Sequence, residues 1–122
     1  MLIGVDSATV ENGVLAGDLD PMNGHFWTWQ SGYIHFKLEG TSPACPTRQN
    51  KFQIHVGGYQ APNNTFRKII LPVVASSTLN IEISLDKIIQ QMFGRQLFQM
   101  MSPGPTAVAL ADLFPQIFQI KK

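Results

Sequence analysis

The sequence is poor in charge, and no charge of one sign is concentrated anywhere. Only 14% of the 122 residues are charged, and nine basic against eight acidic side chains leave a net charge of +1. Ordinary domains carry roughly a quarter of charged residues. Binding to phosphates needs clustered cations, and the sequence never places more than two basic residues side by side. We therefore predict that nucleic acid is not a partner.

Cysteine and long apolar runs are also scarce. Cys45 is the only cysteine, so no disulfide framework or zinc ribbon can form within the chain. It lies in the proline-flanked segment 42–46, which we expect to be an exposed loop. No stretch approaches the ~18–20 apolar residues of a membrane span, so we predict no transmembrane segment. The first residues lack the features of a signal peptide, so the protein is either cytosolic or exported by a signal outside these residues.

Motifs of catalysis are absent as well. The sequence has no nucleophile elbow, no HExxH and no glycine-rich phosphate loop. Acid–base pairs leave no spacing signature, but the eight acidic residues are scattered and give such a pair little support. We predict that the protein is not an enzyme.

Turn-forming and β-forming residues are what the sequence has in quantity. Ten Gly and eight Pro divide the chain into short segments. Residues 25–39 are rich in aromatic and β-branched residues and predict one long strand. Its alternation changes phase, from odd-numbered Trp27 and Trp29 to even-numbered Ile34 and Phe36. A period-2 pattern changes phase where a residue is inserted, so we expect a bulge and a bend near Gly32.

The remaining pattern predicts a mostly β fold. We expect a single mostly β domain over residues 1–122, with one or two short helices near the C-terminus. The expected strands are 51–56, 66–74, 78–84 and 116–120, and the expected helices are 85–93 and 106–114.

The long predicted strand carries candidate metal ligands. His25, Trp27 and Trp29 project to one side of it, and His55 lies in the next strand, within reach across a sheet. Imidazole is a good ligand for copper and zinc, and thioethers add a preference for Cu(I). The alternative is structural, because tryptophans on a strand commonly pack in a core and a strand histidine is commonly a satisfied polar residue. Candidate thioethers belong to Met22, Met92, Met100 and Met101.

A weaker pattern precedes this strand. Asp18, Asp20 and Asn23-Gly24 match part of a calcium-binding loop of the DxDxxG kind, without the later Glu ligand. Calcium at Asp18 and Asp20 is one interpretation, and an ordinary turn is the one we favour.

Three segments resemble a known family. Residues 17–40 read GDLDPMNGHFWTWQSGYIHFKLEG, residues 52–59 read FQIHVGGY, and residues 107–118 form an alanine-rich end. Together they resemble the MbnP-like copper-binding domain, a family of secreted or periplasmic bacterial proteins. The first block is long and unusual, which makes the resemblance specific.

The resemblance implies a β-sandwich-like domain, export to the periplasm or beyond, and copper binding. In such relatives a tryptophan is oxidised to kynurenine by a partner, a dihaem cytochrome c peroxidase-like protein of the MbnH kind. The modified residue then joins histidines as a copper ligand. Carried over here, the candidate for oxidation is Trp27 or Trp29, and the candidate histidine ligand is His55.

The chain also departs from the family pattern. His25 stands where the family usually has methionine, which replaces a thioether by an imidazole. The upstream strands of the family domain are missing, so we expect a chain that begins inside the domain. A sheet that lacks strands leaves an exposed edge, and such an edge predicts a homodimer.

Two alternatives to copper binding remain at this point. A metal-free binding or adhesion module would use Trp27, Trp29 and Tyr33 as a core stripe or as a stacking platform for sugar or peptide. An enzyme would need a cleft that pairs a carboxylate with His35 or His55.

Overall fold

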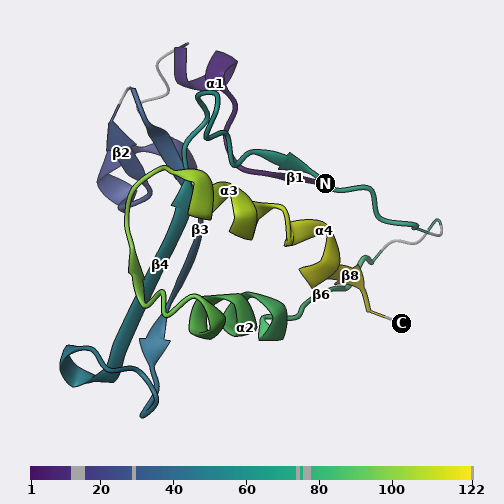
Figure 1. The fold of residues 1–122 in the computed structure, drawn as a ribbon. Helices are drawn as coiled ribbons and strands as arrows, with labels where there is room; N and C mark the ends of the chain where they lie inside the picture. The colour runs from purple at the N-terminus through teal and green to yellow at the C-terminus, as the bar shows by residue number, and fades with distance from the viewer. Residues whose placement is uncertain (12–15, 29, 74, 76–77, 122) are drawn as a thin grey trace.

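A four-stranded sheet forms the centre of the protein, with the strand order β2-β3-β4-β7. Its structure comes from a computed structural model that describes residues 1–11, 16–28, 30–73, 75 and 78–121. The strands β2 and β3, and then β3 and β4, pair antiparallel, while β7 runs parallel to β4 (Figure 1). Their bounds are Phe26–Thr28 for β2, Gly32–Thr41 for β3, Lys51–Gly57 for β4 and Gln99–Met100 for β7.

Two small antiparallel sheets and several short helices complete the fold. The small sheets pair β1 (Leu2–Ile3) with β5 (Arg67–Lys68) and β6 (Ile81–Ile83) with β8 (Phe118–Ile120). The α-helices are α1 (Ser7–Glu11), α2 (Asp86–Gly94), α3 (Pro105–Ala111) and α4 (Phe114–Ile117). Single 3₁₀ turns lie at Gly17–Leu19, Pro21–Asn23 and Arg48–Asn50. The predicted mostly β class, with short helices near the C-terminus, is confirmed.

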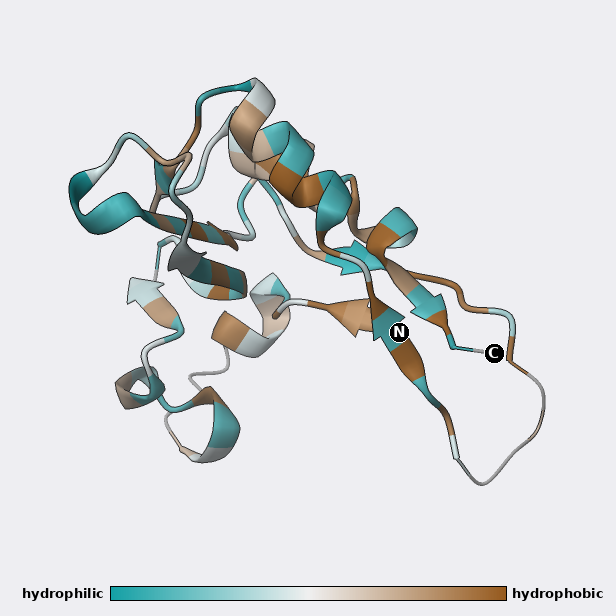
Figure 2. Cartoon of the chain, turned by 90° about the horizontal axis from the view of Figure 1, so that it is seen from below, coloured by the Kyte–Doolittle hydropathy of each residue, from teal (hydrophilic) through white to brown (hydrophobic). Residues whose placement is uncertain are grey.

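The core lies between the main sheet and the last three helices. Ile54 and Val56 of β4 are fully buried against side chains of α2, α3 and α4. Phe36 of β3 reaches Phe114 of α4, with ring centroids 5.4 Å apart. In Figure 2 hydrophobic and hydrophilic residues alternate along the strands and helices. The even-numbered residues of β4 therefore face the core, as their alternation predicted, and His55 belongs to the opposite face.

The single long strand predicted over residues 25–39 is wrong. The chain reverses direction instead, so that Phe26 of β2 lies opposite Tyr33 of β3. Gly32 has φ +76°, and a Cβ there would lie 2.3 Å from the Tyr59 ring, so only glycine fits at this position. The alternation of apolar and polar residues changes phase at this reversal, because β2 and β3 are separate strands and each has its own alternation. The pairing shifts register opposite Gly32, between Phe26 and Thr28 of β2, so the irregularity expected near Gly32 is present; a second shift lies between Ile34 and Phe36 of β3.

Other predicted elements were partly right. The strand expected at 66–74 shortens to Arg67–Lys68, and Ile70 beyond it is 86% exposed. The strand expected at 78–84 is Ile81–Ile83, whose isoleucines stay largely exposed. The helix expected at 106–114 is divided between α3 and α4. Pro115 does not end a helix but lies in the first turn of α4, where its missing N–H removes no hydrogen bond within the helix. Cys45 is buried, not exposed as predicted.

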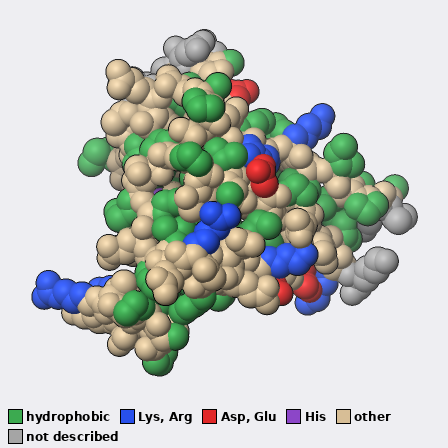
Figure 3. All heavy atoms as spheres, viewed as in Figure 1, with side chains coloured by type: hydrophobic (Ala, Val, Ile, Leu, Met, Phe, Trp, Pro, Cys, Tyr) green, Lys and Arg blue, Asp and Glu red, His purple; other side chains and the backbone are tan. Residues whose placement is uncertain are grey.

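No helix among the described residues is both long enough and apolar enough to cross a membrane. On the face shown in Figure 3, charged side chains stand singly or in small groups, and they form no continuous patch.

Candidate metal centre

The register of β3 and β4 brings four polar side chains together on the face of the sheet away from the helices. His55 lies opposite Lys37, and Gln53 lies opposite Glu39. Glu39 is therefore the diagonal neighbour of His55, a spacing that long side chains can bridge across an antiparallel pair. The sequence placed His55 on a strand, but it did not place Glu39 beside it.

His55 is held in one orientation by that neighbour. Its Nε2 lies 2.5 Å from Oε1 of Glu39, while its Nδ1 is buried and has no hydrogen-bond partner among the described residues. Only 5% of the residue is exposed. The hydrogen bond from His55 is the main cause that lowers the pKa of Glu39, so the carboxylate is the acceptor and Nε2 carries the proton. The buried Nδ1 then presents its lone pair.

Trp27 lies over the strand that carries His55. One of its ring carbons, Cζ3, would be 3.0 Å from a Cβ built on Gly57. Gly57 follows His55 by two residues in β4, so both belong to the same face of the sheet. Trp27 itself is half-buried. The glycine therefore makes room for the indole ring beside the histidine.

His25 immediately precedes β2 and lines a hollow together with Asp18 and His35. Its backbone O accepts a hydrogen bond from the N–H of Ile34 at 2.8 Å, and its Nδ1 lies 3.3 Å from the Ile34 carbonyl O. The charges of His55, Lys37 and His25 each contribute to lowering the pKa of Glu39, after the hydrogen bond from His55. His25 is exposed, whereas His55 is buried.

Other predicted ligands are not part of this arrangement. Trp29 lies outside the described residues. Met92 is fully buried in the core and Met100 packs against it, so both thioethers lie on the helix-covered face. Met22 is 90% exposed. Over the described part of the chain, no three or more His, Cys, Asp or Glu side chains lie close enough together to hold a metal ion.

The segment considered for calcium forms a turn held by its own hydrogen bonds. Asp20 accepts from the backbone N–H of Met22 at 2.9 Å and caps the 3₁₀ turn Pro21–Asn23. The side-chain amide of Asn23 donates to the carbonyl O atoms of Gly17 and Asp18. Calcium at Asp18 and Asp20 stays an untested prediction.

Tyr33 does not belong to an aromatic platform at the surface. The residue is 3% exposed, its hydroxyl donates to the carbonyl O of Leu19 at 2.5 Å, and its ring meets the edge of Phe26 with centroids 5.1 Å apart. Of the three aromatic residues proposed for a platform, Tyr33 is therefore a core residue.

Comparison with known proteins decides the family. The MbnP family model matches residues 1–106, most of the 122-residue chain. The chain belongs to the MbnP family. No curated protein and no solved structure matches it. Membership of the MbnP family points to a copper-associated function in a methanobactin-related context.

Two features of this MbnP-family chain were missed by sequence reasoning. Glu39 was overlooked because its role depends on the pairing of β3 with β4. His35 lies at the β3 bulge, where its Nδ1 is 3.0 Å from Oγ1 of Thr65 and burial lowers its pKa. The phase change in residues 25–39 signalled the irregularity opposite Gly32, between Phe26 and Thr28, but it did not signal the second register shift at His35.

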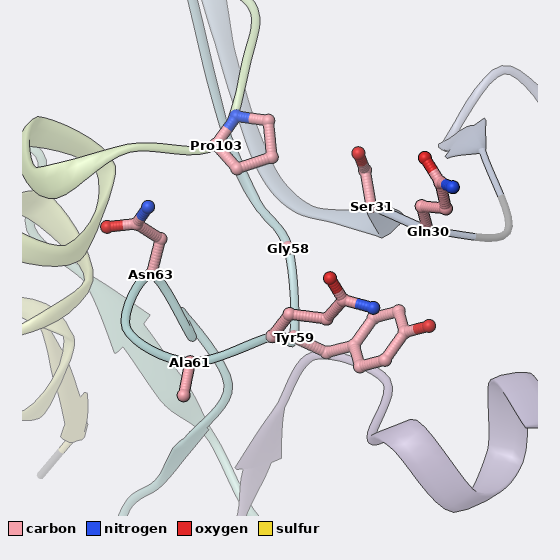
Figure 4. A pocket seen from close by; sticks show the side chains of 8 residues that line it. Gln30, Ser31, Gly58, Tyr59, Ala61, Asn63 and Pro103 are labelled. Carbon is pink, nitrogen blue, oxygen red and sulfur yellow. The ribbon is translucent and has the colours of Figure 1, made fainter.

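A small cleft lies apart from the histidine and its carboxylate. It encloses about 150 Å³ and is lined by uncharged residues, among them Ser31, Tyr59 and Asn63. Figure 4 shows Pro103 above the ring of Tyr59, with Ser31 and Gln30 on the neighbouring segment. The cleft offers amide and hydroxyl groups but no imidazole or thiolate, so it does not provide copper ligands.

Proposed function

We propose that this MbnP-family protein binds copper in the bacterial cell envelope, as a periplasmic or secreted protein and not as an enzyme. His55 is the principal ligand, His25 is the second imidazole, and an oxidised tryptophan completes the set. The observation that carries the proposal is the buried Nδ1 of His55, which has no partner among the described residues, in the strand where the Trp27 ring lies against Gly57. Family membership supports the choice of copper.

The residues around His55 fit a metal ion. Histidines that ligate metals commonly donate their other ring N–H to a carboxylate, which fixes the tautomer and makes the ligand more basic. Glu39 supplies such a carboxylate. A buried polar atom without a partner is unfavourable, and a bound metal ion would satisfy Nδ1. Neutral imidazole suits copper.

Trp27 is our candidate for oxidation to kynurenine, because among the described residues it contacts the β4 strand near His55. The oxidant is peroxide, used by a partner of the dihaem cytochrome c peroxidase-like class. Opening of the indole ring adds two oxygen atoms from two peroxides, which are reduced to water. Hydrolysis of the resulting formamide by one water releases formate and leaves kynurenine. The net change is the loss of one carbon and the gain of one oxygen.

A copper titration tests the proposal. Purified protein is titrated with Cu(I) and with Cu(II) against a competing chelator. The masses of tryptic peptides that contain Trp27 are measured by mass spectrometry before and after exposure to the peroxidase. We expect the wild-type protein to bind one equivalent of copper tightly and the His55→Ala variant to lose this binding. The matched control is His35→Asn, which removes a half-buried histidine of the same sheet. Equal binding by wild type and His55→Ala would refute the assignment.

A further inference from the structure

We propose that Glu39 is a positioning residue of the copper site, which holds His55 as a ligand through Nδ1 only. This inference rests on the proposed function, and it deepens it by naming the ligating atom and the side chain that selects it. Nothing in the sequence pattern distinguishes Glu39 from Glu82, another strand glutamate, until β3 is paired with β4.

The geometry around His55 leaves a single nitrogen for a ligand. Nε2 is occupied by Oε1 of Glu39 at 2.5 Å, and Nδ1 has no partner among the described residues. Ligation through Nε2 would require that hydrogen bond to break. Ligation through Nδ1 keeps it and satisfies the remaining buried atom, so both ring nitrogens are then used.

The position of Glu39 suits this role. Its side chain is 46% exposed, so its charge stays hydrated, while the His55 side chain that it holds is only 6% exposed. A carboxylate at the edge of solvent avoids much of the penalty of a buried charge and still accepts a strong hydrogen bond. The partly exposed carboxylate of Glu39 therefore fixes the orientation of the buried His55 imidazole.

Lys37 is the cation that could compete for this carboxylate. It lies directly opposite His55 in the strand pairing, but its Nζ donates to the carbonyl O of Gly24 at 2.7 Å. That bond directs the ammonium group toward the turn before β2. His55 and not Lys37 is consequently the hydrogen-bonded partner of Glu39.

Silver identifies the ligating atom directly. Ag(I) is a spectroscopically useful substitute for Cu(I), and its nucleus couples to a bonded ¹⁵N. In ¹⁵N-labelled protein loaded with Ag(I), we expect a silver–nitrogen coupling at Nδ1 of His55, while Nε2 keeps its proton. Coupling at Nε2 would overturn the inference and leave His55 as a ligand, so the proposed function would survive.

Substitutions at Glu39 measure its contribution. Loss of a carboxylate partner typically weakens metal binding about 10–100-fold. We expect Glu39→Ala to lower the affinity for Ag(I) and for Cu(I) by about that factor, and Glu39→Gln to lose less, since its amide oxygen still accepts from Nε2. The control Glu82→Gln removes an exposed glutamate on β6 and should bind as wild type.

Each outcome has a distinct meaning. Glu39→Gln keeps the hydrogen bond, so it serves as the folded comparison if Glu39→Ala is unstable. If both Glu39 variants bind with wild-type affinity and His55→Ala does not bind, the positioning role of Glu39 is overturned and the proposed function survives. Silver binding that is unaffected by His55→Ala would instead overturn the proposed function, and this inference with it.

Discussion

At the scale of single residues, two imidazoles of the main sheet each have one buried ring nitrogen without a hydrogen-bond partner among the described residues. His55 keeps its proton on Nε2 through Glu39, and His35 is held through Nδ1 by the hydroxyl of Thr65. Thr65 itself donates to the carbonyl O of Gly58 at 3.1 Å, so its oxygen is free to accept from His35. Both imidazoles are thereby fixed in a defined tautomer.

The pKa of His35 predicts a loss of stability in acid. Burial lowers this pKa below its ordinary value of 6.5. Above that value both folded and unfolded chains carry a neutral His35, so the residue has no effect. As the pH falls below it, the unfolded chain takes up a proton before the folded one, and the free energy of unfolding decreases. Urea denaturation at about pH 7.5 and about pH 5.5 should show this loss.

The variant His35→Asn serves as the control, because an amide can still donate to Thr65 but does not titrate. We expect a smaller change in its denaturation midpoint between the two pH values. An unchanged pH dependence would mean that His35 is not its source.

Glycine at position 57 is required by close contacts. A Cβ there would lie 2.5 Å from the Tyr33 carbonyl O, 2.8 Å from the Ile34 Cα and 3.0 Å from the Trp27 ring. We predict that Gly57→Ala lowers the free energy of unfolding by about 1–3 kcal/mol, as overpacking does. A Cβ built on Gly94, at the end of α2, meets no atom within 4 Å, so Gly94→Ala should be neutral or stabilising. Equal losses in thermal denaturation would contradict this account.

At the scale of elements, sequence reasoning succeeded where one face of an element is buried. The alternation of β4 predicted its core face because Ile54 and Val56 pack under the helices. The same reasoning failed for residues 25–39, where a three-residue and a ten-residue strand are joined by a reversal that has no unique signal in the sequence. It also failed for Ile81 and Ile83, whose alternation with Glu82 is not matched by burial.

Helix α2 provides a test of the core. Met92 is fully buried among side chains of the sheet and the other helices. We predict that Met92→Ala lowers the free energy of unfolding by about 2–5 kcal/mol, through lost burial and a cavity. Met22→Ala, at a residue that is 90% exposed, should change it by less than about 0.5 kcal/mol. A comparable loss in both variants would place Met92 outside the core.

At the scale of the whole molecule, the candidate site depends on three strands that the chain brings together from residues 25 to 57. His25, Trp27 and His55 were predicted to share a side of a sheet, and the structure places Trp27 beside the strand of His55. The contribution of Glu39 could not be predicted, because it follows from a diagonal pairing that only the register reveals. Family membership was predictable, since residues 17–40 carry a specific motif.

Self-association is also a property of the whole molecule. The main sheet ends at β2 and β7, and several large apolar side chains are at least half exposed among the described residues, including Ile70, Val73, Leu79 and Ile83. Open sheet edges and exposed apolar side chains favour pairing with another chain. We predict a concentration-dependent homodimer in sedimentation velocity. A single monomeric species at all concentrations would contradict it.

The most direct test of the central claim is the copper content of protein produced in the cell envelope together with a dihaem peroxidase of the partner class. After removal of loosely bound metal, we predict one copper per wild-type chain, a Trp27 peptide that has lost one carbon and gained one oxygen, and little copper in His55→Ala. Wild-type protein that holds no copper, or His55→Ala that holds as much as wild type, would contradict the account.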